Sequence, residues 1–392
     1  MIGVSRLLCG TTMRADGLRY GQPAGSVGGR PHSAAERKPV VVWNCTRACN
    51  LACAHCYYSA RARQDPDELS TDEARRMIDD LAQYGVPVLL FSGGEPLLRD
   101  DLFALGAYAV ARGLHTVIST NGTLIDQAMA RRIRAAGFSY VGISLDGMRD
   151  INDRFRGRQG AFAAALAGIG HCKQAGVRVG LRLTLNRHNV GNLDAIFSLL
   201  ERERIPRACF YHLVYAGRGQ QIRADDLTPA ETRAAMDMIF ARTEDFHACG
   251  VPCEILTVDN HTDGPYLLQR VQARWPKRTD EVLEMLRWNG GNASGSGIAD
   301  IDHLGRVHAD QFWQHYSFGN VRERPFSEIW GDTRDPLLAG LRDRKPRLHG
   351  RCSRCRYLDL CNGNLRVRAE AVYGDPWAPD PACYLTEKEL LA

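Results

Sequence analysis

Residues 49–56 read CNLACAHC and place three cysteines, Cys49, Cys53 and Cys56, within one short segment. The segment follows residues 40–43, an apolar run rich in β-branched side chains that predicts a buried strand. Barrel and open α/β enzymes carry their chemistry on loops at the carboxyl ends of such strands. Three thiolates on one loop can hold a four-iron cluster and leave one iron open to a cofactor or substrate.

Zinc is the alternative ligand for these thiols, with His55 or Cys45 completing the site. Cys45 can also, in principle, replace Cys49 as a cluster ligand. Zinc knuckles rarely follow a buried strand within a barrel-like pattern, so the position of the segment favours the iron–sulfur interpretation.

A regular alternation of strand and helix patterns continues from Pro39 onward. Short apolar runs predict strands over residues 40–43, 86–91, 115–119, 140–144, 177–185 and 209–215. Apolar residues at helical spacing predict helices over residues 71–84, 100–112, 126–136, 161–175 and 192–203, and a further helix is predicted over residues 229–246. Such an alternation indicates an α/β fold with a parallel sheet and right-handed crossovers. A curved, incomplete barrel fits better than a flat sheet, although the pattern alone does not separate them.

The same pattern predicts three parts of the chain. Residues 1–38 are rich in Gly, Arg, Ala and Ser without periodicity, which predicts a flexible arm. Residues 39–250 form the barrel. Residues 251–392 form a loop-rich extension, in which residues 254–258 predict a strand and residues 281–288 a helix.

The Cys49-x3-Cys53-x2-Cys56 spacing, followed by Tyr57, is similar to the signature of the radical S-adenosylmethionine (SAM) superfamily. Segments at the ends of the next predicted strands also match: Ser92-Gly93-Gly94-Glu95-Pro96, Ser119-Thr120-Asn121-Gly122 and Gly142-Ile143-Ser144-Leu145-Asp146-Gly147. The match spans residues 40–215. It implies a partial (β/α)6 barrel, a [4Fe–4S] cluster on Cys49, Cys53 and Cys56, and SAM bound at the open iron.

The resemblance also implies which residues bind the cofactor: Gly93, Gly94, Glu95, Asn121, Ser144, Arg156 and Arg182. Two glycines let a backbone approach a ligand closely, and Glu95 offers an acceptor to an ammonium group. Ser144 is the favoured polar contact. Asp146, Arg156 and Arg182 are weaker candidates, for which a helix cap or a surface ion pair is an equally good explanation.

A second group of thiols lies in the tail, as Cys352-x2-Cys355-x5-Cys361 and, after 21 residues, Cys383. Four thiolates can hold zinc or a four-iron cluster, and spacing does not distinguish them. The tail resembles the auxiliary-cluster (SPASM/twitch-like) extension of one branch of the superfamily. Because His308-Ala309-Asp310 stands where longer versions have a further cysteine, the resemblance implies one auxiliary [4Fe–4S] cluster.

Within this branch, several segments resemble proteins of haem d1 biosynthesis: residues 290–295, 308–313, 319–321, 325–330 and 374–385. This resemblance implies that didecarboxysiroheme, an iron tetrapyrrole, is the substrate. Two of its propionate groups would be processed toward oxo groups through a 5′-deoxyadenosyl radical. A reductant protein such as flavodoxin or ferredoxin would be a partner. Three alternatives stay open: a peptide-modifying maturase, a haem b pathway propionate decarboxylase and a non-catalytic zinc-binding interaction protein.

A tetrapyrrole needs a wide pocket with apolar walls and cations for its carboxylates. Candidate wall residues are Phe312, Trp313 and Tyr316, and candidate cations are Arg182, Arg218 and Arg306. His303, His308 and His315 are candidate axial ligands to the substrate iron, with His308 as the tentative catalytic residue. For each of these residues, a routine place in the core or on the surface is the competing explanation.

Composition limits the class of protein. The 392 residues carry a net charge of +5, which is too small and too evenly spread to predict a nucleic-acid partner. No stretch approaches the roughly 18–20 apolar residues of a membrane span, and the N-terminus has no signal-peptide core. We therefore expect a cytoplasmic protein without a membrane partner, in which grouped thiols bind metal rather than form disulfides.

Overall fold

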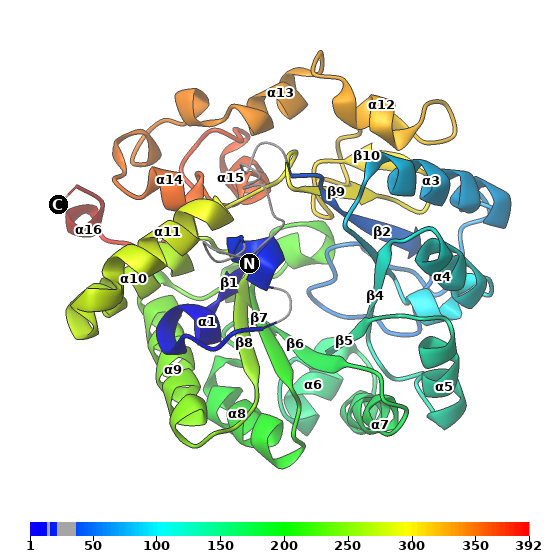
Figure 1. Ribbon diagram of the computed structural model, residues 1–392, viewed down its shortest axis with the longest axis horizontal. Coiled ribbons are helices and arrows are strands. Elements are labelled where there is room, and N and C mark those ends of the chain that lie inside the picture. Colours follow the sequence, from blue (N-terminus) through cyan, green and yellow to red (C-terminus); the bar gives the residue numbers. More distant parts are fainter. Residues whose placement is uncertain (14–15, 22–36, 392) are drawn as a thin grey trace, which may run out of the picture.

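The parallel sheet is the centre of the computed structural model, which describes residues 1–13, 16–21 and 37–391 (Figure 1). Neighbouring parallel strands follow the order β8-β7-β6-β5-β4-β3-β2. Their bounds are β2 (Val40–Thr46), β3 (Val88–Gly93), β4 (His115–Thr120), β5 (Tyr140–Ser144), β6 (Val179–Leu185), β7 (Arg207–His212) and β8 (Glu254–Val258). The six predicted strands correspond to β2–β7, and the predicted partial barrel is confirmed.

Helices cover the outer face of the curved sheet, as Figure 1 shows. They are α3 (Thr71–Tyr84), α4 (Leu102–Ala111), α5 (Gln127–Ala135), α6 (Arg149–Arg156), α7 (Ala161–Gln174), α8 (Leu193–Arg202) and α9 (Pro229–Ala248). In α3 the buried residues recur at helical spacing, at Ala74, Met77, Ile78 and Leu81. This spacing is the feature that predicts such helices, and of this group only the short α6 is not predicted.

The N-terminal segment corrects one expectation. Residues 1–38 are predicted as a flexible arm, but β1 (Ile2–Gly3) pairs antiparallel with β8 and α1 (Val4–Cys9) packs against α9. Ile2, Val4, Leu7 and Leu8 are all buried. Burial of these apolar residues and pairing with an otherwise open strand edge outweigh the low periodicity of the segment. A second short helix, α2 (Asp16–Tyr20), follows; residues 14–15 and 22–36 of the predicted arm lie outside the described ranges.

The boundary expected at residue 250 is also corrected. β8 completes the parallel series, and the extension adds β9 (Ile298–Ile301) in parallel to β2, followed by β10 (Arg306–His308) and β11 (Gly319–Asn320). Barrel and extension therefore share one sheet. Hydrogen bonding across the edge of β2 joins the two parts, which local sequence patterns do not reveal.

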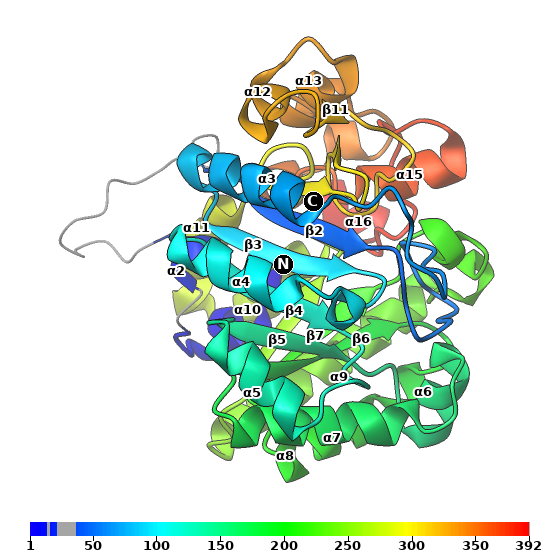
Figure 2. The same ribbon diagram turned by 90° about the vertical axis from the view of Figure 1, so that its right-hand side faces the viewer.

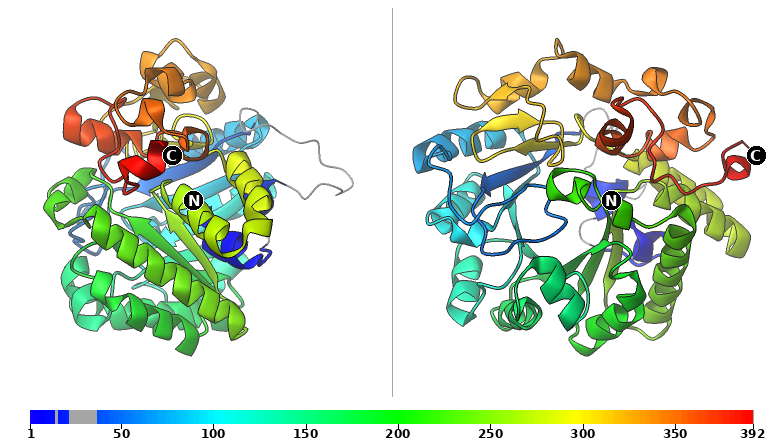
Figure 3. Two further views of the ribbon diagram at one scale, coloured as in Figure 1. Left: turned by 90° about the vertical axis from the view of Figure 1, so that its left-hand side faces the viewer. Right: turned by 180° about the vertical axis from the view of Figure 1, so that it is seen from behind.

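The remaining helices of the extension lie over the open side of the barrel (Figures 2 and 3). They are α10 (Asp263–Arg274), α11 (Thr279–Asn289), α12 (Phe326–Gly331), α13 (Pro336–Arg342), α14 (Leu358–Cys361), α15 (Arg366–Tyr373) and α16 (Glu387–Leu391). α14 packs on α10 and α11, which follow the barrel, so the tail spans the gap between the two sides of the incomplete barrel. Among the described helices, none has the length and apolar character needed to cross a membrane.

Candidate active site

The first cysteine group lies on the loop that follows β2 and faces a large cavity inside the barrel. Cys49, Cys53 and Cys56 all line this cavity, whose volume is about 460 Å³. The Leu51 amide N–H points to Cys49 Sγ at 3.4 Å, and the Ala60 amide N–H points to Cys56 Sγ at 3.5 Å. Such N–H···S contacts stabilise negative charge on sulfur, which fits thiolates that bind iron.

Glycines at the end of β3 set the path of this loop. A Cβ atom on Gly94 would lie 2.1 Å from the Ala48 carbonyl oxygen, and one on Gly93 would lie 2.4 Å from the Thr46 carbonyl oxygen. Only glycine permits these approaches. The sequence predicts glycines that admit a ligand; the contacts present here are with the cysteine loop itself, and both glycines also line the cavity.

Glu95 has a different environment from the one predicted. Its carboxylate accepts hydrogen bonds from the Asn121 amide at 2.8 Å, the Thr120 hydroxyl at 2.7 Å and the Leu97 amide at 3.1 Å. Burial raises its pKa to about 7. The side chain is fully buried and is not part of the cavity lining formed by the described residues. Glu95 thus ties β3 to β4, and its contact with a cofactor ammonium stays a prediction.

Arg156 links the first cysteine group to the carboxylate that follows β5. Its guanidinium forms a buried ion pair with Asp146 and points to Cys53 Sγ at 3.6 Å. Asp146 also lies 3.3 Å from the His55 Nε2 atom. The ion pair is therefore internal rather than on the surface, and it places a cation directly beside a thiol of the first group.

Arg182 occupies the interior of the barrel beside Ser144. It donates a hydrogen bond to Ser119 Oγ and lies over the Tyr211 ring, 5.6 Å from the ring centroid. A Cβ atom on Gly142 would lie 2.5 Å from Arg182 Nε, so the glycine on β5 makes room for this side chain. The cavity is lined by the predicted cofactor residues other than Glu95: Gly93, Gly94, Asn121, Ser144, Arg156 and Arg182.

The predicted substrate contacts are only partly brought together. Phe312, Arg182 and Arg218 line the cavity. Trp313 is fully buried and packs with Tyr316 in a separate apolar cluster, and Arg306 points to solvent at the start of β10. Phe312 therefore belongs to the cavity lining and its neighbour Trp313 does not.

None of the predicted axial ligands His303, His308 and His315 lines the cavity, so their role as ligands stays a prediction that the cavity lining does not support. His308 is fully buried, with Nδ1 at 2.7 Å from the Tyr316 carbonyl and Nε2 at 3.6 Å from an Asp302 oxygen. Its position on β10 directs it into the extension rather than the barrel. The histidines that line the cavity are His55, His212 and His261, and the latter two stand at or just after the ends of β7 and β8.

Cys45, whose role the sequence leaves open, is a core residue. It is fully buried, and its thiol lies 3.3 Å from the Ser92 carbonyl oxygen. Since it does not line the cavity that Cys49 lines, the simpler assignment of ligands agrees with the geometry.

The second cysteine group surrounds a separate, small cavity of about 20 Å³. Cys352, Cys355, Cys361 and Cys383 line it together with apolar residues such as Leu358, and burial raises the pKa of each thiol. Iron binding would offset this rise in pKa, because a thiol that coordinates a metal is deprotonated. No group of His, Cys, Asp or Glu in the described ranges is close enough to hold one metal ion. A four-iron cluster binds each thiolate to a different iron, so its thiols are expected to lie further apart.

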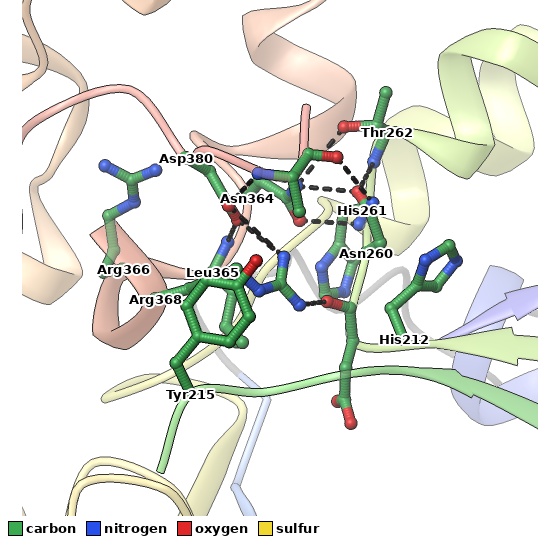
Figure 4. A network of polar contacts seen from close by, with 12 residues as sticks. His212, Tyr215, Asn260, His261, Thr262, Asn364, Leu365, Arg366, Arg368 and Asp380 are labelled. Carbon is green, nitrogen blue, oxygen red and sulfur yellow. Dashed lines mark hydrogen bonds and ion pairs between the residues drawn. The ribbon is translucent and has the colours of Figure 1, made fainter. Parts of the chain in front are cut away.

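A network of polar contacts joins residues that line the large cavity to residues that line the small one (Figure 4). His261 and Leu365 line the large cavity, whereas their neighbours Thr262 and Asn364 line the small one. The His261 amide donates to Asn364 Oδ1 at 2.7 Å, and Asn364 Nδ2 donates to Asn260 Oδ1 at 2.7 Å. The two sites are thus separated by two short segments that are hydrogen-bonded to each other.

Comparison with known proteins identifies the family. Residues 43–200 match the radical SAM superfamily, and residues 294–356 match an iron–sulfur cluster-binding domain, SPASM. An Fe-coproporphyrin III synthase of Methanosarcina barkeri is 56% identical over 394 residues, covering 100% of this chain and 99% of that protein. The chain belongs to the radical SAM superfamily. This radical SAM enzyme uses SAM, the [4Fe–4S] cluster of the barrel and one auxiliary [4Fe–4S] cluster.

Two further known proteins are similar to this chain, one in sequence and one in structure. A pre-heme d1 synthase of Dinoroseobacter shibae is 46% identical over 354 residues, covering 90% of this chain and 87% of that protein. The crystal structure of Streptococcus suis SuiB bound to the precursor peptide SuiA superimposes with a TM-score of 0.71 at 17% identity, covering 90% of this chain and 77% of that one. The second similarity shows the shared fold alone.

Proposed function

We propose that this radical SAM enzyme modifies the carboxylate-bearing substituents of an iron tetrapyrrole. One observation carries the proposal from the structure: the first cysteine group shares a wide cavity with the cations of Arg156, Arg182 and Arg218. Fixed guanidinium groups are the residues that best bind carboxylates. Similarity over the full chain to an Fe-coproporphyrin III synthase supports the same class of substrate.

The reaction chemistry agrees with this cavity. The C–H bonds in the carboxylate-bearing substituents of a tetrapyrrole are unactivated, so no basic group of the protein can remove their hydrogen as a proton. The bound cofactor and cluster supply a 5′-deoxyadenosyl radical, which can break such bonds. The protein supplies the three thiols, the Arg156–Asp146 pair beside them, and a cavity inside the barrel in which the cofactor and the substrate can meet.

The relatives favour a product different from the one that the sequence alone suggests. Identity is 56% with the Fe-coproporphyrin III synthase and 46% with the pre-heme d1 synthase. We therefore propose a product of the iron coproporphyrin III type, with the haem d1 route as the second candidate. A coproporphyrin retains its propionates, whereas the haem d1 route processes two of them, so the product distinguishes these candidates.

An anaerobic assay tests the proposal. Reconstituted, reduced enzyme is mixed with SAM and didecarboxysiroheme, and 5′-deoxyadenosine and the mass of the tetrapyrrole are followed together. We expect 5′-deoxyadenosine together with a product that matches authentic iron coproporphyrin III. A product with two modified propionates would move the enzyme to the haem d1 route. Formation of 5′-deoxyadenosine with an unchanged tetrapyrrole would reject the substrate class and favour a peptide maturase.

The source of the reducing electron is also a proposal. We propose a flavodoxin- or ferredoxin-type partner, since the cluster of the barrel requires reduction before each cleavage of the cofactor. A chemical reductant in the assay above separates this question from that of the substrate.

A further inference from the structure

Asp259, directly after β8, lies in the wall of the large cavity, and its carboxylate has no partner among the residues that the structure describes. It lines the cavity and is 9% exposed. Across residues 1–13, 16–21 and 37–391, its carboxylate oxygens form no hydrogen bond or ion pair, although its backbone carbonyl does. A buried polar group without a partner is costly, and in a native cavity it indicates a ligand that completes its contacts.

The backbone holds Asp259 in an unusual conformation that fixes this orientation. Its φ angle is +67°, in the left-handed region that few residues other than glycine adopt. The Asp259 carbonyl accepts a hydrogen bond of 2.7 Å from Arg368, which is fully buried and forms an ion pair of 3.1 Å with Asp380. The carbonyl thus faces the wall beside the second cysteine group, which leaves the carboxyl group to the cavity.

The surroundings of Asp259 favour its protonated form near neutrality. Burial raises its pKa to about 7, and the positive charge of Arg368 on α15 opposes that rise. Among the described residues, the other charged or titratable groups near it are the Met1 amino group, Tyr211 and His212 on β7, and Asp310 after β10. Protonated Asp259 can donate a hydrogen bond, whereas the anion that forms as the pH rises repels other carboxylates.

We propose that Asp259, as a neutral acid, donates a hydrogen bond to one carboxylate substituent of the tetrapyrrole and so positions it in the cavity. The inference rests on the proposed function, because it requires a substrate that carries carboxylates. Arg182 and Arg218 attract several carboxylates by charge alone. Asp259 can bind only the carboxylate that reaches the cavity wall beside the second cysteine group. It therefore selects one orientation of the tetrapyrrole ring.

Binding measured against pH tests this role without requiring turnover. The anaerobic holoenzyme with both clusters is titrated with didecarboxysiroheme, and separately with iron coproporphyrin III, by absorbance at pH 6, 7 and 8.5. We expect the wild-type Kd to rise about tenfold from pH 6 to pH 8.5, as loss of a charge-assisted hydrogen bond requires. Asp259→Asn has the same size, tolerates the left-handed backbone and donates at every pH, so its Kd is expected to stay constant.

Two further variants make the test robust. Asp259→Gly also suits the backbone but removes the donor, so we expect weak binding at every pH. Asp245→Asn, an exposed carboxylate of α9, is the matched control and keeps the wild-type pH dependence. Equal pH dependence in wild type and Asp259→Asn, or none in wild type, would overturn the inference. Wild-type enzyme that binds neither tetrapyrrole at any pH would instead overturn the proposed substrate class.

Discussion

The two cysteine sites of this enzyme differ in the size of the cavity that their thiols line. The site with three thiols has the large cavity, and the site with four thiols has the small one. Three cysteines line a cavity of about 460 Å³ that also contains arginines, histidines and a serine. Four cysteines line a cavity of about 20 Å³ with mostly apolar walls. A site with an unused ligand position needs space for a reactant, whereas a site that is closed by four thiols needs none. The open site is therefore the place of chemistry, and the closed one supports it.

Removal of a thiol from the open site should give the largest effect. In Cys53→Ala we expect cleavage of SAM to fall to background, because two thiols do not hold the cluster in place. Iron content, the visible spectrum and 5′-deoxyadenosine formation measure this. Cys45→Ala is the matched control: it removes a buried thiol four residues before Cys49 that lies outside the cavity, so we expect it to keep the cluster and the activity. Loss of activity in the control would mean that Cys45 is a ligand after all.

Removal of a thiol from the closed site should separate two reactions of the open site, the cleavage of SAM and the formation of the tetrapyrrole product. In Cys383→Ala we expect 5′-deoxyadenosine to form while the tetrapyrrole product falls to background. The physical reason is that a substrate radical that is oxidised to a closed-shell product must pass an electron to an acceptor, and we propose the auxiliary cluster on the second cysteine group as that acceptor. Cys249→Ala, at an exposed position, serves as the control. Unchanged product from Cys383→Ala would contradict a role in electron transfer.

The open site also shows what the sequence can and cannot predict. Cys49, Cys53 and Cys56 are close in sequence, so their spacing alone predicts that they meet. Arg182 and Ser144 are predicted because parallel strands bring their carboxyl ends to one edge of the sheet. The place of His308 outside the cavity lining could not be predicted, because the direction of its imidazole depends on β10, a strand of three residues that pairs with β9 of the extension.

Other features depend on contacts between distant parts of the chain. Ile2 and Gly3 form a strand only because Thr257 and Leu256 of β8 present an edge to them. Asp259 is an ordinary loop aspartate in the sequence. Its left-handed backbone and its place in the cavity depend on Arg368, more than a hundred residues later. Its position immediately after the strand predicted over residues 254–258 is the one signal in the sequence that would have drawn attention to it.

Substitution of Arg182 would show whether the open site uses this residue for the cofactor or for the substrate. In Arg182→Gln we expect the Kd of the tetrapyrrole to rise about tenfold to a hundredfold, as expected for loss of a charge-assisted contact. The Kd of SAM should change less, because Arg182 lies over Tyr211 and has no hydrogen bond to a cysteine of the first group. Arg306→Gln, an exposed change outside the cavity, should alter neither constant. A larger effect on SAM than on the tetrapyrrole would assign Arg182 to the cofactor.

Substitution of Ser144 should give the smallest effect. It would show whether this side chain contacts the cofactor or the substrate in the open site. Ser144 ends β5 beside Arg182 and lines the cavity, where a single hydroxyl contact with the cofactor is predicted. Loss of one neutral hydrogen bond costs about 1 kcal/mol, so we expect Ser144→Ala to raise the Kd of SAM roughly fivefold and to leave tetrapyrrole binding unchanged. Equilibrium binding of SAM to the cluster-loaded enzyme measures this. A change in tetrapyrrole binding with constant SAM affinity would move Ser144 to the substrate side, and the cofactor would then depend on the backbone at Gly93 and Gly94 instead.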